Sequence, residues 1–276
     1  MKVDFDDRKI LHNAELALVK AFSEFCRENN LKYFIMGGTF LGAVRHHGFI
    51  PWDDDIDVGM PRPDYERLQK LLAENGQVIG EYPFVTFKNS ETTEYVARLE
   101  NPATKIIDRS ALDVDKRNSW MDVFPLDGMP NGSFSRNLHS FRLLTLRMLL
   151  KYSEFSKVSV NYTERPFVER TLIKVGKVLH PERWLNTQFY LHKLDKALQK
   201  YGYNESNYVI NFMGAYKLKE MFPKKYYMDD KLYDFENLKL NGPHNYDAIL
   251  RQMYGENYMQ PPSEQVKNKH FTEVAK

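Results

Sequence analysis

The chain has 276 residues, of which 42% are hydrophobic and 14% aromatic, so it can build a sizeable core and is not expected to be disordered as a whole. Its 39 lysines and arginines are nearly balanced by 37 aspartates and glutamates, which argues against a nucleic-acid partner. The single cysteine, Cys26, excludes an intrachain disulfide, and no apolar run has signal-peptide or membrane-spanning character, so we expect a soluble cytoplasmic protein.

The first elements predict a helix, a short strand and a second helix around a pair of glycines. Apolar residues recur at helical spacing over residues 6–30, and residues 33–36 are short, apolar and rich in β-formers. This strand stops at Gly37 and Gly38, after which Thr39 is suited to cap a helix that runs through Arg45. The expected local unit is therefore strand, diglycine turn and helix.

The next segments predict a mixed sheet. Residues 55–60 alternate polar and apolar side chains as a half-buried strand does, and residues 64–75 predict a helix closed by Gly76. Four short β-rich stretches follow, separated by turn residues, at residues 84–87, 94–100, 105–108 and 119–124. The first half of the chain is thus predicted to be a mixed α/β sheet.

The second half begins helical. Beyond a predicted turn at residues 127–130, leucine, lysine and arginine recur at helical spacing, with breaks near Asn161 and at Pro181, and a last helix is predicted at residues 246–254. We predict three units in the chain: a catalytic core at residues 1–130, a mainly helical subdomain or insertion at residues 131–205, and an aromatic-rich segment at residues 206–276 that completes the fold.

Two aspartates and the glycine pair suggest a metal site beside a phosphate site. Residues two apart in a strand point to the same face and lie roughly 6.6 Å apart, so Asp55 and Asp57 can converge on one cation. Magnesium takes oxygen ligands, which two carboxylates and a substrate phosphate would supply. The backbone of Gly37 and Gly38 can approach phosphate oxygens closely, and a following helix start favours negative charge. The alternative is a solvated acidic turn at residues 53–57.

A third carboxylate is expected on a neighbouring strand. Asp122 alternates with Met121 and Val123, so it faces the cleft if those two side chains face the core. The alternative is an acid on the solvated face of an edge strand. Asp113 and Asp115 are also two apart, but no strand pattern follows them, and we predict a loop there.

Several stretches resemble a known family. Residues 37–45, with Gly37, Gly38 and Arg45, and residues 48–58, with Trp52, Asp55 and Asp57, look like the LicD-type phosphocholine transferases, to which fukutin and fukutin-related protein are similar. The resemblance continues at residues 122–127, 245–247, 254–255 and 258–262. The order of strand, glycine pair, helix and aspartate-bearing strand is that of the nucleotidyltransferase fold. We therefore predict an α/β (α+β) fold, a nucleotidyltransferase-like mixed sheet flanked by helices, with a helical insertion or second subdomain.

The resemblance implies magnesium-dependent transfer of phosphocholine from CDP-choline to a hydroxyl of a cell-surface glycan precursor, of the teichoic acid or lipopolysaccharide type. It implies that Asp55, Asp57 and Asp122 hold the metal, with two Mg2+ ions expected, and that Gly37, Gly38 and Thr39 hold the donor phosphates. Arg45 can add a cation for the leaving nucleotide, or be a surface charge at a helix end.

Choline recognition requires aromatic faces, because a quaternary ammonium accepts no ordinary hydrogen bond. Trp52, Tyr246, Tyr254 and Tyr258 are the candidates, and each can equally serve packing. Two alternatives to phosphocholine transfer stay open: transfer of another phospho-alcohol, such as ribitol phosphate, or of a nucleotide on the same fold, and a non-catalytic glycan- or nucleotide-binding protein. Three acids that repel one another without a cation argue against mere binding.

Residues 136–151 interleave basic and apolar side chains along a predicted helix. If the acceptor is lipid-linked, this basic amphipathic helix could hold the enzyme at the inner face of an anionic membrane. The alternative is a helix that packs its apolar face on the domain and leaves its charges in solvent.

Overall fold

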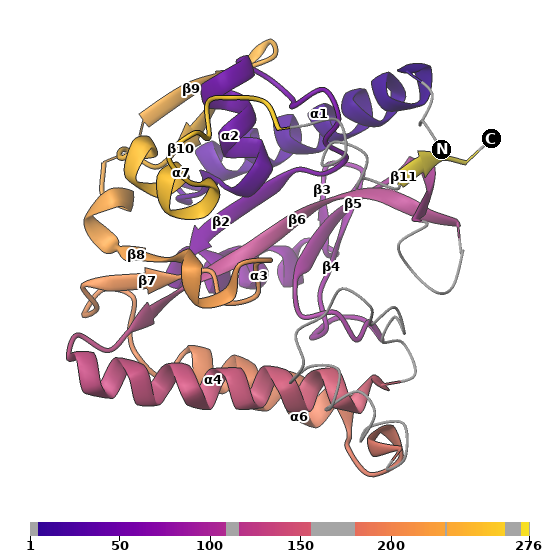
Figure 1. Ribbon diagram of the computed structural model, residues 1–276. Helices are drawn as coiled ribbons and strands as arrows, with labels where there is room; N and C mark the ends of the chain where they lie inside the picture. Colours follow the sequence, from indigo (N-terminus) through magenta and orange to yellow (C-terminus); the bar gives the residue numbers. More distant parts are fainter. Residues whose placement is uncertain (1–4, 109–115, 156–179, 230, 263–271, 276) are drawn as a thin grey trace.

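A computed structural model describes residues 5–108, 116–155, 180–229, 231–262 and 272–275, and its architecture is mixed α/β, as predicted (Figure 1). The main sheet has the strand order β1-β2-β6-β5-β4-β3. Strands β2 and β6 are parallel, while the other neighbouring pairs on this path are antiparallel. Their bounds are β1 (Phe34–Ile35), β2 (Asp57–Pro61), β3 (Val78–Ile79), β4 (Tyr82–Val85), β5 (Ala97–Asp108) and β6 (Lys116–Met129).

Helices α1 (Phe5–Glu28), α2 (Gly37–His46) and α3 (Arg62–Glu74) pack on this sheet. Helix α1 buries an apolar stripe that includes Leu18 and Phe22 and contacts β5 and β6, and α3 contacts β2 and β6. Helix α3 ends where predicted, with Gly76 in the left-handed region at φ 73°. On the same side of the molecule as α2 lie the hairpin β9 (Lys231–Phe235) and β10 (Leu238–Gly242) and helix α7 (Tyr246–Tyr254) (Figure 1).

A second layer is formed by α4 (Ser133–Ser153) and α6 (Thr187–Leu198), which lie side by side away from α1 and α2 (Figure 1). It has its own apolar core, which includes Leu143, Leu191 and Phe212. Strand β7 (Tyr208–Ile210) pairs with β6 and with β8 (Met221–Pro223), and β11 (Thr272–Val274) pairs with β5. Short 3-10 helices span Pro181–Arg183, Lys217–Glu220 and Lys224–Tyr227. None of the helices in the described ranges combines the length and apolarity needed to cross a bilayer.

The start of α2 differs from the prediction. The helix begins at Gly37, so the glycine pair forms its first turn and Met36, not Thr39, is the N-cap residue. The Thr39 hydroxyl is used elsewhere, because it accepts a hydrogen bond from the backbone N–H of Asp57 at 2.9 Å. Strand β2 likewise begins at Asp57, two residues later than predicted, so Asp55 precedes the strand.

The strands β5 and β6 are longer than the sequence pattern indicates. The predicted stretches at 94–100 and 105–108 merge into β5, whose pairing with β6 shifts register between Asn101 and Lys105. The turn predicted at 127–130 is wrong, because β6 runs on to Met129 and pairs there with β7. Gly128 is needed for close approach rather than for a turn: a Cβ there would lie 2.6 Å from the carbonyl oxygens of Tyr201 and Gly202. Asp113, Asp115 and Asn161 lie outside the described residues.

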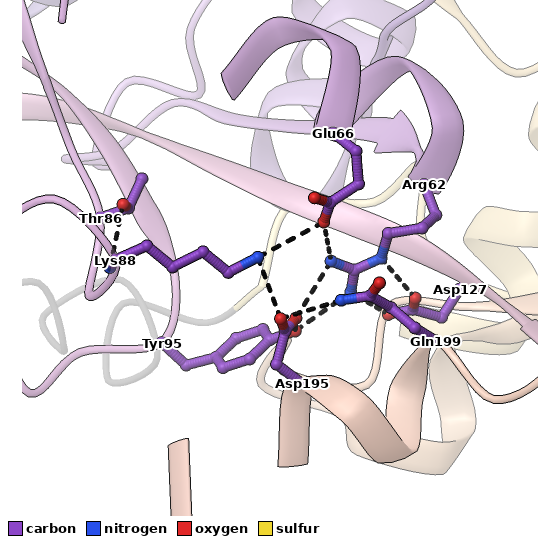
Figure 2. Close-up of polar contacts among 8 residues, drawn as sticks. All are labelled: Arg62, Glu66, Thr86, Lys88, Tyr95, Asp127, Asp195 and Gln199. Carbon is purple, nitrogen blue, oxygen red and sulfur yellow. Dashed lines mark hydrogen bonds and ion pairs between the residues drawn. The ribbon is translucent and has the colours of Figure 1, made fainter. Parts of the chain in front are cut away.

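A buried ion cluster joins α3 to the second layer (Figure 2). The guanidinium of Arg62 donates two hydrogen bonds to Asp127 on β6, at 2.7 and 2.8 Å, and one to Asp195 on α6 at 3.1 Å. The hydroxyl of Tyr95 donates to Asp195 at 2.8 Å, and Lys88 lies 3.0 Å from the same carboxylate. A planar, two-pronged pairing of this kind requires arginine and fixes direction as well as distance. The cluster therefore sets how α6 sits against the sheet.

Candidate active site

A cavity of about 650 Å³ lies beside the amino-terminal end of α2. It is lined by the start of α2, by the acidic run that precedes β2, and by residues from the segments 211–220 and 253–262. Of the residues singled out from the sequence, the lining includes Gly37, Gly38, Arg45, Trp52, Asp55, Asp57, Tyr254 and Tyr258. Thr39 and Asp122 do not line it, and neither does Tyr246, whose ring is covered by Lys231 at 5.1 Å.

The run Asp53-Asp54-Asp55 brings carboxylates together. One carboxylate oxygen from each of the three lies within 4.8 Å of the others. The run is anchored by its backbone, since the N–H of Asp53 donates to the carbonyl of Ile50 at 2.9 Å and its carbonyl accepts from Nε2 of His12 at 2.9 Å. Sequence analysis missed Asp53 and Asp54 as candidates, although both are adjacent to Asp55 in the chain.

The glycine pair is required because two carboxylates lie against it. A Cβ on Gly37 would be 2.7 Å from Oδ2 of Asp57, and a Cβ on Gly38 would be closer still to Oδ2 of Asp53. Any side chain at either position would displace an acid from the cavity wall. The start of α2 therefore meets Asp53 and Asp57 directly, and the positive end of a helix favours such negative charge.

Asp57 is a partly buried acid on the cavity wall. Burial, followed by the charges of Asp55 and Asp122, raises its pKa well above the ordinary value for an aspartate. Its backbone is fixed on both sides, with the N–H donating to Thr39 and the carbonyl accepting from the N–H of Met36 at 3.0 Å. A nearby cation would stabilise the charged form of a carboxylate in this position.

Asp122 lies beside Asp57 but is turned toward an arginine. The two residues are partners in the parallel register of β2 and β6, and Met121 and Val123 are fully buried on the core side. The side chain of Asp122 is 19% exposed and accepts a hydrogen bond from Nε of Arg98 at 3.2 Å. Burial raises its pKa, and Arg98 opposes that shift. Of the three aspartates predicted to hold the metal, Asp55 and Asp57 line the cavity, whereas Asp122 lies on the neighbouring strand and does not line it.

Glu15 on α1 is a buried acid that sequence analysis missed. It is 1% exposed, and neither of its carboxylate oxygens has a hydrogen-bond partner within the described ranges. Burial, followed by the charges of Asp55 and Asp54, raises its pKa well above the ordinary value for a glutamate. The signal was present in the sequence, because residue 15 falls on the same helical stripe as Leu11 and Leu18, where an apolar side chain is expected.

The cation and aromatic groups on the cavity wall are linked to one another. Nη1 of Arg45 donates to the carbonyl of Tyr258 at 2.8 Å, and its guanidinium lies 5.9 Å from the ring centre of Trp52. The end of α2 is thereby tied to the carboxy-terminal segment. Arg45 is not a free surface charge at a helix end, because it is held over the cavity.

Residues 211–220 contribute a further acid and another aromatic ring to the cavity. The carboxylate of Glu220 accepts from Nδ2 of Asn211 at 2.7 Å and from the N–H of Tyr216 at 2.8 Å. Burial raises the pKa of Glu220 to about 7. The rings of Tyr216 and Tyr254 are nearly perpendicular, at 86°, with centres 5.9 Å apart. Sequence analysis found no pattern in this segment, whose role depends on how it folds back onto the site.

The donor set fits a hard divalent cation. Only carboxylate oxygens converge at Asp53, Asp54 and Asp55, and the oxygens of Asp57 lie on the same cavity wall. Oxygen-only groups suit Mg2+, Ca2+ or Mn2+ rather than the softer metals that histidine and cysteine bind. The unpartnered oxygens of Glu15 add to this fit, because a buried acid without a hydrogen bond is unfavourable unless a cation is near.

Comparison with known proteins identifies the chain as a phosphotransferase of the LicD type. It is 29% identical over 268 residues, covering 94% of each chain, to the lipopolysaccharide cholinephosphotransferase LicD of Haemophilus influenzae. Residues 30–138 match the family described as LicD/FKTN/FKRP, nucleotidyltransferase domain. The matched range includes the glycine pair, the acidic run and Asp122.

Two further relatives match a shorter segment. The chain is 42% identical over 62 residues to human ribitol 5-phosphate transferase FKRP, which is 22% of this chain and 12% of FKRP. It is 48% identical over 61 residues to an uncharacterised protein of Rickettsia prowazekii, which is 22% of this chain and 23% of that protein. Both matches cover a segment of this chain rather than its whole length.

Proposed function

We propose that this protein transfers phosphocholine from CDP-choline to a hydroxyl of a cell-surface glycan precursor, of the teichoic acid or lipopolysaccharide type, in a magnesium-dependent reaction. The observation that carries the proposal is a cavity lined by Asp53, Asp55, Asp57 and several aromatic rings, in which Asp53 and Asp57 lie against the glycine pair at the start of α2. Similarity along nearly the whole chain to a cholinephosphotransferase supports phosphocholine as the transferred group.

The cavity residues divide between metal, phosphate and leaving group. Asp53, Asp54, Asp55 and Asp57 would hold Mg2+, which when bound neutralises negative charge on the donor phosphates. The backbone at Gly37 and Gly38 faces the same space and favours phosphate oxygens. Arg45, held by the carbonyl of Tyr258, would stabilise the charge that develops on the departing nucleotide.

In the reaction, an acceptor hydroxyl oxygen forms a bond to the phosphorus that carries choline, and the bond from that phosphorus to the bridging oxygen breaks to release CMP. The hydroxyl proton passes to a carboxylate. We assign this role, or that of a third metal carboxylate, to Asp122, the partner of Asp57 in the register of β2 and β6. The protein contributes mainly alignment and charge neutralisation, as is usual for phosphoryl-type transfer.

The choline group would occupy the aromatic wall. Trp52, Tyr216, Tyr254 and Tyr258 line the cavity together with the buried carboxyl of Glu220. Aromatic faces attract a quaternary ammonium through their negative ring surface, and a carboxylate adds attraction of the same sign. This assignment retains three of the four aromatic residues proposed from the sequence and replaces Tyr246 with Tyr216.

Transfer of another phospho-alcohol, such as ribitol phosphate, is the second candidate, and it is favoured by the segment shared with a ribitol 5-phosphate transferase. Transfer of a nucleotide on the same scaffold, and glycan or nucleotide binding without catalysis, have no comparable observation in their favour. The choice between choline and ribitol rests on which head group the aromatic wall accepts.

A donor comparison tests both the metal and the transferred group. We expect the purified protein with Mg2+ to release CMP from CDP-choline in the presence of a glycan acceptor, and to do so much more slowly from CDP-ribitol. We also expect EDTA to abolish turnover and excess Mg2+ to restore it, because the cavity acids repel one another without a cation. Turnover of CDP-ribitol alone would reject phosphocholine, and activity that persists after thorough chelation would reject the metal.

Helix α4 supports a membrane-associated acceptor. One face is buried through Leu143, Leu146 and Leu150, while a second apolar stripe is exposed, with Phe134 83% and Phe141 69% accessible to solvent. Leu138 and Met148 extend this exposed stripe, and α4 contains no acidic residue. An exposed apolar stripe on a basic helix fits an anionic lipid surface. We therefore propose that α4 holds the enzyme at the inner face of the membrane, where a lipid-linked acceptor would lie.

Vesicle flotation tests the α4 surface. We expect the wild type to float with phosphatidylglycerol vesicles and not with phosphatidylcholine vesicles, and the double variant Phe134→Ser, Phe141→Ser to lose at least roughly tenfold in binding, since each buried phenylalanine contributes about 1.5–3 kcal/mol. Leu232→Ser, which removes an exposed leucine from β9, is the matched control and should bind as the wild type does. Equal flotation of all three proteins would contradict a role for α4.

A further inference from the structure

Residues 211–220 connect β7 to β8 and form one side of the cavity. Strand pairing fixes the two ends of this connection, since Ile210 and Met221 are partners in the antiparallel register. Between these ends, the path of the chain depends on contacts with other parts of the fold. The residues of the connection that line the cavity are Asn211, Gly214, Ala215, Tyr216 and Glu220.

Helix α4 supplies one of these contacts through Arg147. Nη1 of its guanidinium donates to the backbone carbonyl of Phe212, and Nη1 and Nη2 also donate to the carbonyl of Gly214, at 3.3 and 3.4 Å. The guanidinium lies 5.6 Å from the centre of the Phe212 ring, which is fully buried. A single arginine thus holds two carbonyls of the connection, a task that suits its planar, forked group of donors.

The contacts of Arg147 lead through the connection to Glu220. The N–H of Gly214 donates to Oδ1 of Asn211 at 3.2 Å, and Nδ2 of Asn211 donates to the carboxylate of Glu220 at 2.7 Å. Gly214 also lies directly against that carboxylate, because a Cβ on it would collide with both oxygens of Glu220. The position of the Gly214 backbone therefore determines where this acid lies in the cavity.

The far end of the connection is held by α7, independently of Arg147. Nε2 of Gln252 donates to the carbonyl of Lys219 at 2.6 Å, and Nζ of Lys219 donates to the carbonyl of Met253 at 2.8 Å. Removal of the Arg147 contacts should therefore shift the part of the connection near Gly214 without detaching the part held by α7.

We propose that Arg147 is a positioning residue for the head group of the donor, and that it acts through residues 211–220. Arg147 itself does not line the cavity, so its effect must pass through Gly214 and Glu220. The inference rests on the proposed function, which places the choline group beside Tyr216 and Glu220. It gives α4 a second role, because the helix with the exposed apolar stripe also holds one side of the donor cavity.

Arg147→Met tests the inference in the full-length protein with Mg2+ and a glycan acceptor, because methionine keeps an apolar stem beside Phe212 and removes every donor. We expect KM for CDP-choline to rise by roughly tenfold, the factor that one lost hydrogen bond to a charged group gives, with kcat changed by less than about twofold. In isothermal titration calorimetry, affinity for CDP-choline should fall by a similar factor. Affinity for CMP, which lacks the phosphocholine group, should stay unchanged.

Two other substitutions on the same helix serve as comparisons. Arg147→Lys should fall between the wild type and Arg147→Met, since an ammonium group cannot reproduce the forked contacts with both carbonyls. Arg142→Ala removes an exposed arginine from α4 and is the matched control, which should change neither KM nor the two affinities.

A folded Arg147→Met protein with the wild-type KM and affinity for CDP-choline would overturn the inference, and so would an equal loss of affinity for CDP-choline and CMP. If Arg147→Met does not fold, Arg147→Lys decides the question, and wild-type values in that variant would overturn it. A wild type that binds CDP-choline without releasing CMP would reject the proposed function, and calorimetry would still decide on Arg147. Failure of the wild type to bind CDP-choline would reject both.

Discussion

Asp57→Asn will lower turnover of the donor by about a thousandfold or more. The substitution keeps the size of the side chain and removes the charge of an acid that lines the cavity and lies against Gly37. Metal and charge neutralisation in phosphoryl-type reactions contribute several kcal/mol to the barrier, and about 4 kcal/mol corresponds to that loss of rate. Single-turnover release of CMP measures the effect, and Asp55→Ala should behave alike.

The same variant should not be less stable than the wild type without metal. The pKa of Asp57 is raised in the folded protein, so the stability that the wild type has at low pH is lost as pH rises through that raised pKa. Asparagine does not titrate, so near neutral pH the metal-free variant should unfold at an equal or higher temperature.

Asp234→Asn is the matched control, because Asp234 lies exposed on β9 and pairs only with Lys239 among the described residues. It should leave both rate and stability unchanged. An Asp57→Asn enzyme with more than a tenth of the wild-type rate would contradict the assignment of Asp57 to the reaction. An inactive variant that is also unfolded would show instead that the residue is needed for structure.

Arg62→Ala will lower the free energy of unfolding by about 3–5 kcal/mol, the range observed when one partner of a buried ion cluster is removed. The substitution leaves Asp127 and Asp195 buried, and within the described part of the chain it removes both hydrogen bonds that Asp127 accepts from a side chain. Equilibrium unfolding in urea measures the change.

Arg62→Lys should recover only part of this loss, because an ammonium group cannot reproduce the two parallel hydrogen bonds to Asp127. Lys70→Ala, at an exposed position on the same helix, is the control and should change stability by less than about 0.5 kcal/mol. A loss below about 1 kcal/mol in Arg62→Ala would mean that the cluster does not hold the second layer in place.

The local patterns of the sequence were sufficient for much of the fold. Helix α7 has the predicted bounds, and α1 and α3 are within two residues of theirs, because helical periodicity and end signals are properties of neighbouring residues. The alternation at Met121, Asp122 and Val123 correctly gave the core side of β6. Two of the cavity aspartates, Asp55 and Asp57, could be predicted because they are close together in the chain.

The misses depend on residues far apart in sequence. Strand β6 continues through Gly128 because β7, some eighty residues later, pairs with it, and nothing near residue 128 indicates that partner. The hydroxyl of Thr39 suits a helix cap, but it accepts a hydrogen bond from the N–H of Asp57, a residue of β2, instead. Glu220 and Tyr216 reach the cavity through a loop without periodicity, so only the folded chain brings them there.

Strand β6 connects the candidate site to the second layer. It carries Asp122 next to Asp57 and, five residues further on, Asp127, which accepts hydrogen bonds from Arg62. The two residues are separated by roughly 17 Å along the extended backbone. The second layer, with its exposed α4 stripe, is thus joined through Asp127 to the same strand that carries Asp122. If α4 rests on a bilayer, the orientation of the whole molecule on that surface also fixes the direction from which an acceptor must enter.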